Sequence, residues 1–146
     1  MFQMVDVINL QRKVKLDASI FTAFVVTLRS AIREVECRNF SVALVSDRRM
    51  TELNKFFRGK DSTTDVLSFP HEADEFETDR SNLGDIVISA ERARDQAKEN
   101  KLTLELEIKQ LVLHGVLHLC GYDHETDSGV MNARELELRK ELHIQG

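Results

Sequence analysis

The segment between Thr103 and Gly121 constrains the fold more than any other part of the chain. It reads LELEIKQLVLHGVLHLC, with apolar side chains at helical spacing that cover most sides after Leu111. Thr103 is a typical N-cap residue, and Gly121 can take the left-handed conformation that ends many helices. A helix that is apolar on most sides must be covered by other elements, so we expect this one to run through the core.

Strand and helix signals surround this segment. Runs rich in β-branched and aromatic residues predict strands at 5–9, 40–46, 65–69 and 85–89. Helical spacing and capping residues predict helices over 18–36 with Asp17 as N-cap, from Asp47 as N-cap, from Ser89 to about Asn100, and over 127–143. Strands early and helices late favour an α/β fold of the mixed (α+β) kind. We expect one domain over 1–146, with a single mixed sheet of about four strands and helices packed on it.

The composition limits the classes of protein to consider. With 146 residues, 42% hydrophobic and 31% charged, the chain is that of an ordinary globular domain. No apolar run approaches the roughly 20 residues of a membrane span, and the N-terminus has no signal-peptide pattern. Cys37 and Cys120 form no CxxC pair, which suits a reducing compartment. We therefore expect a cytoplasmic protein without a membrane partner.

The charge distribution is uneven. The net charge of −5 argues against indiscriminate binding to nucleic acid, and we expect no DNA partner. A basic stretch nevertheless lies at 48–60, and an acidic stretch lies at 72–79. Whether the basic residues form a patch depends on the fold.

Three of the five histidines fall within residues 114–124, HGVLHLCGYDH. His114 and His118 are four residues apart, so both lie on one face of the helix. Gly121 lets the chain reverse, which allows His124 to complete a third corner. Three neutral imidazoles leave the fourth position of a tetrahedral zinc ion open, as catalytic sites do. We expect one zinc ion, with another divalent transition metal as the alternative.

Two simpler interpretations of the histidines are weaker. In the first, the rings only satisfy hydrogen bonds in a buried helix, which suits a lone histidine better than three in this register. In the second, the metal is structural, but structural zinc usually takes four protein ligands and the cysteines lack ligand spacing. Cys120 is expected to be a core thiol.

Gly115 stands where a zinc protease has its glutamate. In HExxH proteases that glutamate activates the water and delivers a proton to the leaving amine. Cleavage of a phosphodiester depends less on such a group, because a metal and a positive charge can assist alkoxide departure. Gly115 therefore favours a hydrolysis other than that of peptides.

The motif HGVLHLCGYDH, together with TTDVLSFP (63–70) and LGDIVIS (83–89), resembles the YbeY family of bacterial endoribonucleases along nearly the whole chain. The resemblance implies a single-domain, metal-dependent endoribonuclease specific for single-stranded RNA. It implies a role in maturation of the 3′ end of 16S rRNA, in ribosome biogenesis and in quality control, with rRNA and the ribosome as partners. It implies metal ligation by His114, His118 and His124, and a functional role for Arg58. Thr63 departs from the basic residue or proline that the family often has before its TDVLSFP threonine.

Arg58 and His114 are the candidate catalytic residues. A guanidinium opposite the metal can stabilise charge that builds up on phosphorane oxygens. Without the resemblance, a solvated arginine at a helix end would be the better interpretation of Arg58. Four further basic residues are candidate phosphate contacts, although a solvated helix face explains them nearly as well: Arg48, Arg49, Lys55 and Lys60. Phe56 and Phe57 are candidates for base stacking, with a core role favoured for at least one of them.

Metal-bound histidines usually donate their second N–H to a carboxylate or a carbonyl. The candidate carboxylates are Asp65, Asp85 and Asp123, for which roles in strand starts or turns are equally good interpretations. Tyr122 is expected to pack, His71 to lie on a surface loop, and His143 to lie in the last turn of the final helix.

Two other functions stay open at the level of sequence. One is a ribosome-assembly binding factor whose metal is structural, and the other is a metal-dependent hydrolase of another substrate. The nucleophile is also open, because both a metal-activated hydroxide and the RNA 2′-hydroxyl fit the motif.

Overall fold

The computed structural model describes residues 6–72, 74–77 and 81–146. Its strands are β1 (Val7–Asn9), β2 (Asn39–Val45), β3 (Val66–Pro70) and β4 (Asn82–Ser89). Its helices are α1 (Ala18–Ala31), α2 (Asp47–Arg58), α3 (Ala90–Glu99), α4 (Leu104–Leu119) and α5 (Val130–Glu141), with a 3₁₀ turn at Arg33–Val35. The predicted mixed α/β fold is confirmed, apart from the details of some element ends.

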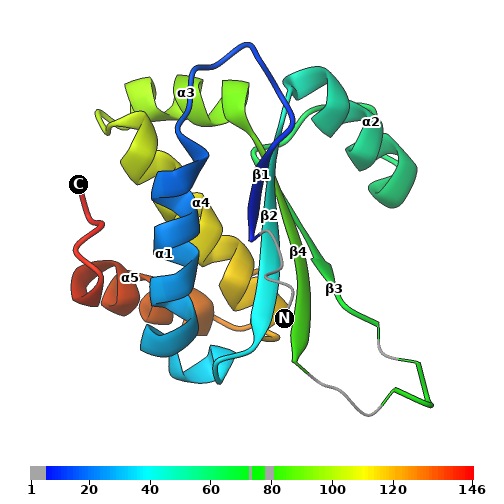
Figure 1. Ribbon diagram of the computed structural model, residues 1–146, viewed down its shortest axis with the longest axis vertical. Helices are drawn as coiled ribbons and strands as arrows, with labels where there is room; N and C mark the ends of the chain where they lie inside the picture. Colours follow the sequence, from blue (N-terminus) through cyan, green and yellow to red (C-terminus); the bar gives the residue numbers. More distant parts are fainter. Residues whose placement is uncertain (1–5, 73, 78–80) are drawn as a thin grey trace.

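The described strands form one sheet in the order β1-β2-β4-β3 (Figure 1). β1, β2 and β4 are parallel, and β3 runs antiparallel to β4. β3 therefore forms one edge of the sheet, and one wall of the candidate site is built on this edge.

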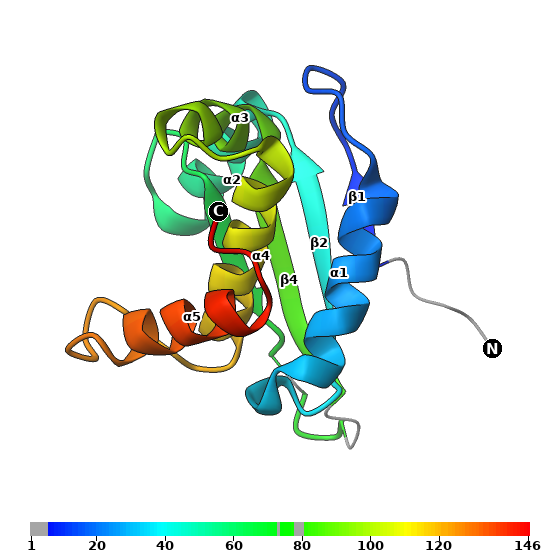
Figure 2. The same cartoon turned by 90° about the vertical axis from the view of Figure 1, so that its left-hand side faces the viewer.

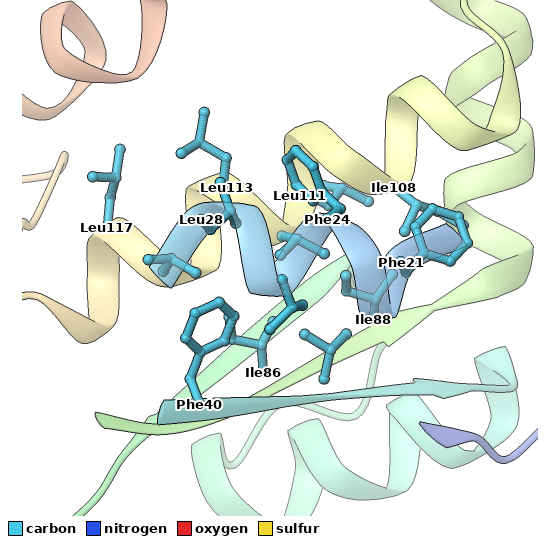
Figure 3. Close-up of a cluster of buried hydrophobic side chains, with 14 of the residues drawn as sticks. Phe21, Phe24, Leu28, Phe40, Ile86, Ile88, Ile108, Leu111, Leu113 and Leu117 are labelled. Atoms are coloured by element: carbon cyan, nitrogen blue, oxygen red, sulfur yellow. The ribbon is translucent and has the colours of Figure 1, made fainter. Parts of the chain in front are cut away.

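Helices cover both faces of the sheet, and one face carries more of them than the other. α1 and α4 lie on one face, and α5 packs against α4 away from the sheet (Figures 1 and 2). The main core fills the space between these helices and the sheet, with Leu28 of α1, Ile86 and Ile88 of β4 and Leu113 of α4 fully buried (Figure 3). This packing holds α4 against the sheet, so the side chains of α4 have fixed positions.

The opposite face of the sheet carries a smaller core under α2. It consists of Val45, Met50, Leu67 and Val87. The prediction that Phe56 or Phe57 belongs to the core is wrong, because they are 81% and 57% exposed. The buried side of α2 is narrow, and Phe57 makes only edge contacts with the rings of Phe56 and Phe69.

The boundaries of α4 follow the predicted signals. The Thr103 hydroxyl accepts a hydrogen bond from the Leu106 N–H at 3.1 Å, which caps the first turn. Gly121 has a φ of +101°, a conformation that glycine takes without strain, and the chain turns there.

In the described part of the chain, no helix combines the length and hydrophobicity needed to cross a lipid bilayer.

Several predicted boundaries are wrong in detail. α2 has Ser46 rather than Asp47 as its N-cap, with the hydroxyl accepting from the Arg49 N–H. α1 ends at Ala31, because Ile32 is extended and a 3₁₀ turn follows. α5 begins only at Val130, since the Asp127 carboxylate accepts from nearby backbone N–H groups in a turn. Residue 5 of the first predicted strand lies outside the described residues.

Candidate metal centre

Three histidines converge at the C-terminal half of α4 and the turn that follows it. Nε2 of His118 lies 3.2 Å from Nε2 of His114 and 3.2 Å from Nδ1 of His124. One ring nitrogen of each residue lies within 4.8 Å of the others, so the three side chains can hold a metal ion. His114 and His118 are adjacent on α4, and the turn after Gly121 brings His124 back toward them, as the spacing predicted.

These distances suit a tetrahedral ion. Zinc–nitrogen bonds of about 2.0–2.1 Å at tetrahedral angles separate ligand nitrogens by about 3.3 Å. The 3.2 Å separations on either side of His118 agree with this geometry. Burial, followed by the charges of His114 and His124, lowers the pKa of His118, which favours the neutral imidazole that a metal requires.

A carboxylate that the sequence analysis missed fixes the orientation of His114. Oε1 of Glu135 lies 2.6 Å from Nδ1 of His114, and Oε2 accepts a hydrogen bond of 2.7 Å from Arg139. An ionised carboxylate has no proton to donate, so Nδ1 carries the hydrogen and leaves Nε2 free for a metal. Burial alone would raise the pKa of Glu135, but the His114 and Arg139 contacts more than offset it and hold that pKa below its usual value.

The sequence contained a signal for Glu135. Met131, Glu135 and Leu138 form the buried side of α5, at the i, i+4, i+7 spacing of one helix face. A glutamate on an otherwise apolar face needs a partner, and His114 and Arg139 supply it. The pattern does not reveal that the partner is a histidine of another helix, because that pairing depends on how α5 packs on α4.

The histidines lie in a cleft of about 620 Å³. β3 forms one wall, with Val66, Leu67 and Ser68 among its lining residues, and Arg58 at the end of α2 also lines the cleft. The Arg58 side chain is exposed and forms no hydrogen bond or ion pair with any described residue. The fold thus brings a free guanidinium and the histidine cluster, which are more than fifty positions apart in the chain, to the same cleft.

Gly115 points into the sheet rather than into the cleft. A Cβ atom built on Gly115 would lie 2.9 Å from Cγ2 of Ile86, which is closer than such atoms normally approach. The Gly115 carbonyl accepts a hydrogen bond from the Ser68 hydroxyl, which joins α4 to β3. A glutamate at this position would have no room in the present packing and could not reach the metal site from there.

None of the three candidate aspartates contacts a histidine through a hydrogen bond. Asp65 lines the cleft, but its carboxylate accepts from the Val66 N–H at the start of β3. Asp123 accepts from the Glu125 N–H and shapes the turn before His124. The proposed role of Asp85 is wrong, because its side chain accepts from Ser41 on the sheet face away from α4.

The remaining side chains have structural environments. Tyr122 packs on the core and donates to Glu34 at 2.9 Å, which confirms the packing role. Burial raises the pKa of the Cys120 thiol to about 11, as expected for a thiol in the core. His71 is exposed and pairs with Glu77, whereas His143 lies just after α5 rather than in its last turn.

The four other basic candidates do not line the cleft. Arg48 and Arg49 form ion pairs with Glu52 along α2, at 3.8 and 3.0 Å. Lys55 and Lys60 are exposed. A solvated helix face therefore accounts for these residues, and Arg58 differs from them in its position at the cleft.

Comparison with known proteins places the chain in a family. The family model described as Endoribonuclease YbeY matches residues 6–143. An Endoribonuclease YbeY of Nautilia profundicola is 47% identical over 107 residues, which cover 73% of this chain and 74% of the relative. An Endoribonuclease YbeY of Finegoldia magna is 37% identical over 145 residues, which cover 96% and 94% of the two chains.

A solved structure has the same fold. The solution structure of TM1509 from Thermotoga maritima aligns with a TM-score of 0.61 at 29% sequence identity, over 92% of this chain and 85% of that one. The family match extends over the strands, the cleft and all three histidines. On this evidence the chain belongs to the Endoribonuclease YbeY family.

Proposed function

We propose that this chain is a single-domain, metal-dependent endoribonuclease that cleaves single-stranded RNA in the cleft between α4, β3 and the end of α2. The observation that carries the proposal is the presence of three converging imidazoles and a free guanidinium in that one cleft. The names of the relatives supply the reaction, since they are endoribonucleases. The site supplies groups suited to a phosphodiester.

His114, His118 and His124 would hold one zinc ion, with another divalent transition metal as the alternative. A metal held in this way supplies Lewis acidity to a phosphate oxygen. Glu135 keeps Nδ1 of His114 protonated and thereby directs Nε2 toward the cluster. Arg58 is the group that binds the phosphate and stabilises the negative charge that develops on its oxygens.

The cleft also favours RNA over a peptide. Cleavage of a peptide requires a proton for the leaving amine, and the glutamate that provides it in zinc proteases is replaced by a glycine that faces Ile86. A purely structural metal is disfavoured by a set of three protein donors that opens onto a cleft. We propose the 3′ end of small-subunit rRNA as the substrate, on the ribosome and in the cytoplasm.

The test uses metal-analysed protein with an RNA that carries the 3′ end of small-subunit rRNA. We expect metal-dependent cleavage of the single-stranded RNA and no cleavage of the same sequence in a duplex. Arg58→Ala should lose cleavage while it retains the metal, and Arg48→Ala on the exposed side of α2 serves as the matched control. Absence of cleavage by metal-loaded protein, on free RNA and on small subunits, would support an assembly factor instead.

A further inference from the structure

A second pocket is lined by His114 but by neither His118 nor His124. Its volume is about 500 Å³, and it shares Asp65, Val66 and His114 with the first cleft. The two spaces therefore adjoin at the residue that would hold the metal. In the proposed function, a strand of RNA with a phosphate at the histidines would therefore bring a neighbouring base close to this pocket.

The pocket contains buried polar groups with unused hydrogen-bonding capacity. Glu107 is 4% exposed, and its Oε1 accepts a hydrogen bond of 2.7 Å from Asn100. Gln110 is 6% exposed, and its Nε2 donates to the Ile144 carbonyl at 2.7 Å. Glu107 Oε2 and Gln110 Oε1 have no hydrogen-bond partner among the residues that the structure describes. Neither oxygen is among the described atoms that are both cut off from solvent and unpaired, so within these nearly buried side chains each oxygen is open to the pocket and can accept a hydrogen bond from a ligand there.

The lining of the pocket disfavours two classes of ligand. Glu107, Asp65 and Glu135 are acidic, and Arg139 is paired through one nitrogen with Glu135 at 2.7 Å while its Nε is buried without a partner among the described residues, so the acidic groups outnumber the basic one and a phosphate is disfavoured. A second metal ion is also disfavoured, because within the described ranges only the three histidines gather as a donor set. A ligand with hydrogen-bond donors and no negative charge fits this lining.

The pocket also has apolar walls and neutral polar groups. Val66, Leu102 and Leu111 provide apolar surface, and the amides of Gln96 and Gln145 lie among the polar lining groups. Proteins hold extruded bases between apolar side chains and read their edges by hydrogen bonds. A carboxylate accepts from an exocyclic amine, as in contacts to N4 of cytosine, and repels the carbonyl that uracil has in the same place.

We propose that this pocket binds a nucleobase next to the scissile phosphodiester, and that Glu107 selects a base with an exocyclic amine over uracil. The proposal rests on the proposed nuclease function for the placement of the RNA. Glu107 acts here as a specificity residue, through Oε2, while Asn100 holds Oε1 in place.

The test measures binding rather than cleavage. Full-length, metal-loaded protein is titrated with fluorescent 2′-O-methyl oligocytidine and oligouridine of equal length, each checked on a gel to remain uncut. We expect oligocytidine to bind about tenfold more tightly, the effect of one hydrogen bond to a charged group. Glu107→Gln should reduce the ratio of the two affinities to near one, because an amide can also donate to the uracil carbonyl.

Glu105→Gln is the matched control, since Glu105 lies on the exposed side of the same helix and pairs with Lys109. It should retain the preference of the wild type. Equal affinities in the wild type, or a preference that survives in a folded Glu107→Gln variant, would overturn the proposal. Cleavage of unmodified RNA is measured separately: cleavage without a base preference would contradict only the proposal for the pocket, and a base preference without cleavage would contradict only the proposed nuclease function.

Discussion

The two sides of the cleft differ in how firmly their functional groups are held. On one side, His114 is bound through Glu135 to Arg139, and α4 is anchored in the main core. On the other side, Arg58 is the last residue of α2, exposed and without a partner among the described residues. The histidines are therefore preorganised, whereas in the proposed function the Arg58 side chain would lose conformational freedom only when the substrate binds.

This difference separates two kinds of variant. Changes on the histidine side should alter metal binding and, through it, activity. Changes at Arg58 should alter activity alone. The following predictions test that division, beginning with the largest expected effect.

Replacement of His118 by alanine removes the central donor of the cluster. We expect its metal affinity to fall by more than the 10–100-fold that loss of a supporting hydrogen bond costs, with cleavage lost as well. Metal content after dialysis measures the effect. His143→Ala, at an exposed position after α5, provides the control and should keep a full complement of metal. Stoichiometric metal in a folded His118→Ala protein would contradict the assigned site.

Arg58→Ala should lower kcat by about 10²–10³-fold, the usual loss when one group that stabilises transition-state charge is removed. Its metal content should match that of the wild type, because Arg58 belongs to the other side of the cleft. Single-turnover cleavage and metal analysis are measured on the same preparation. Loss of metal in this variant would show that the two sides are coupled.

Glu135→Gln should weaken metal binding by about 10–100-fold. The amide keeps the shape of the side chain but removes the charge that holds the Nδ1 hydrogen of His114. Competition with a chelator gives the affinity, and Glu141→Gln at an exposed position on the same helix is the control. Unchanged affinity would mean that packing alone orients His114.

Gly115→Ala should lower the free energy of unfolding by about 1–3 kcal/mol, as overpacked core positions do. The reason is the contact between the new methyl group and Ile86. Chemical denaturation measures the loss. Combination with Ile86→Ala, which removes Cγ2, Cγ1 and Cδ1 of Ile86, should recover part of it relative to the sum of the two single losses, and additive losses in the double variant would exclude this contact as the cause.

Glu34→Gln should have the smallest effect, a loss of about 1–2 kcal/mol near neutral pH. Hydrogen bonds from Arg134 hold the pKa of Glu34 at about 2, well below its usual 4.5. The carboxylate therefore stabilises the fold above pH 4.5, and this contribution disappears as the pH falls through about 2. The free energies of unfolding of the wild type and the Glu34→Gln variant, measured by chemical denaturation, should converge as the pH falls over that range. A constant difference would assign the loss to packing.

The parts of the site that sequence could predict are those within one local segment. His114, His118 and His124 are separated by a helical turn and a glycine, so their convergence follows from local geometry. Thr103 marked the start of α4 for the same reason. The sequence could not predict which side chains of distant elements contact one another. Glu135 reaches His114 only because α5 packs on α4, and Asp85 misses the site because alternation along β4 turns it to the other face.

The close packing of Gly115 on Ile86 also bears on the history of the motif. A glycine codon can become a glutamate codon by one base change, which would turn HGVLH into the HEVLH of a zinc protease. In this fold the new carboxylate would be buried against a β-strand before it could serve any chemistry. A lineage that began from this chain would first have to enlarge the space between α4 and β4. One base change thus separates the two motifs, and the packing of Ile86 against Gly115 opposes that change.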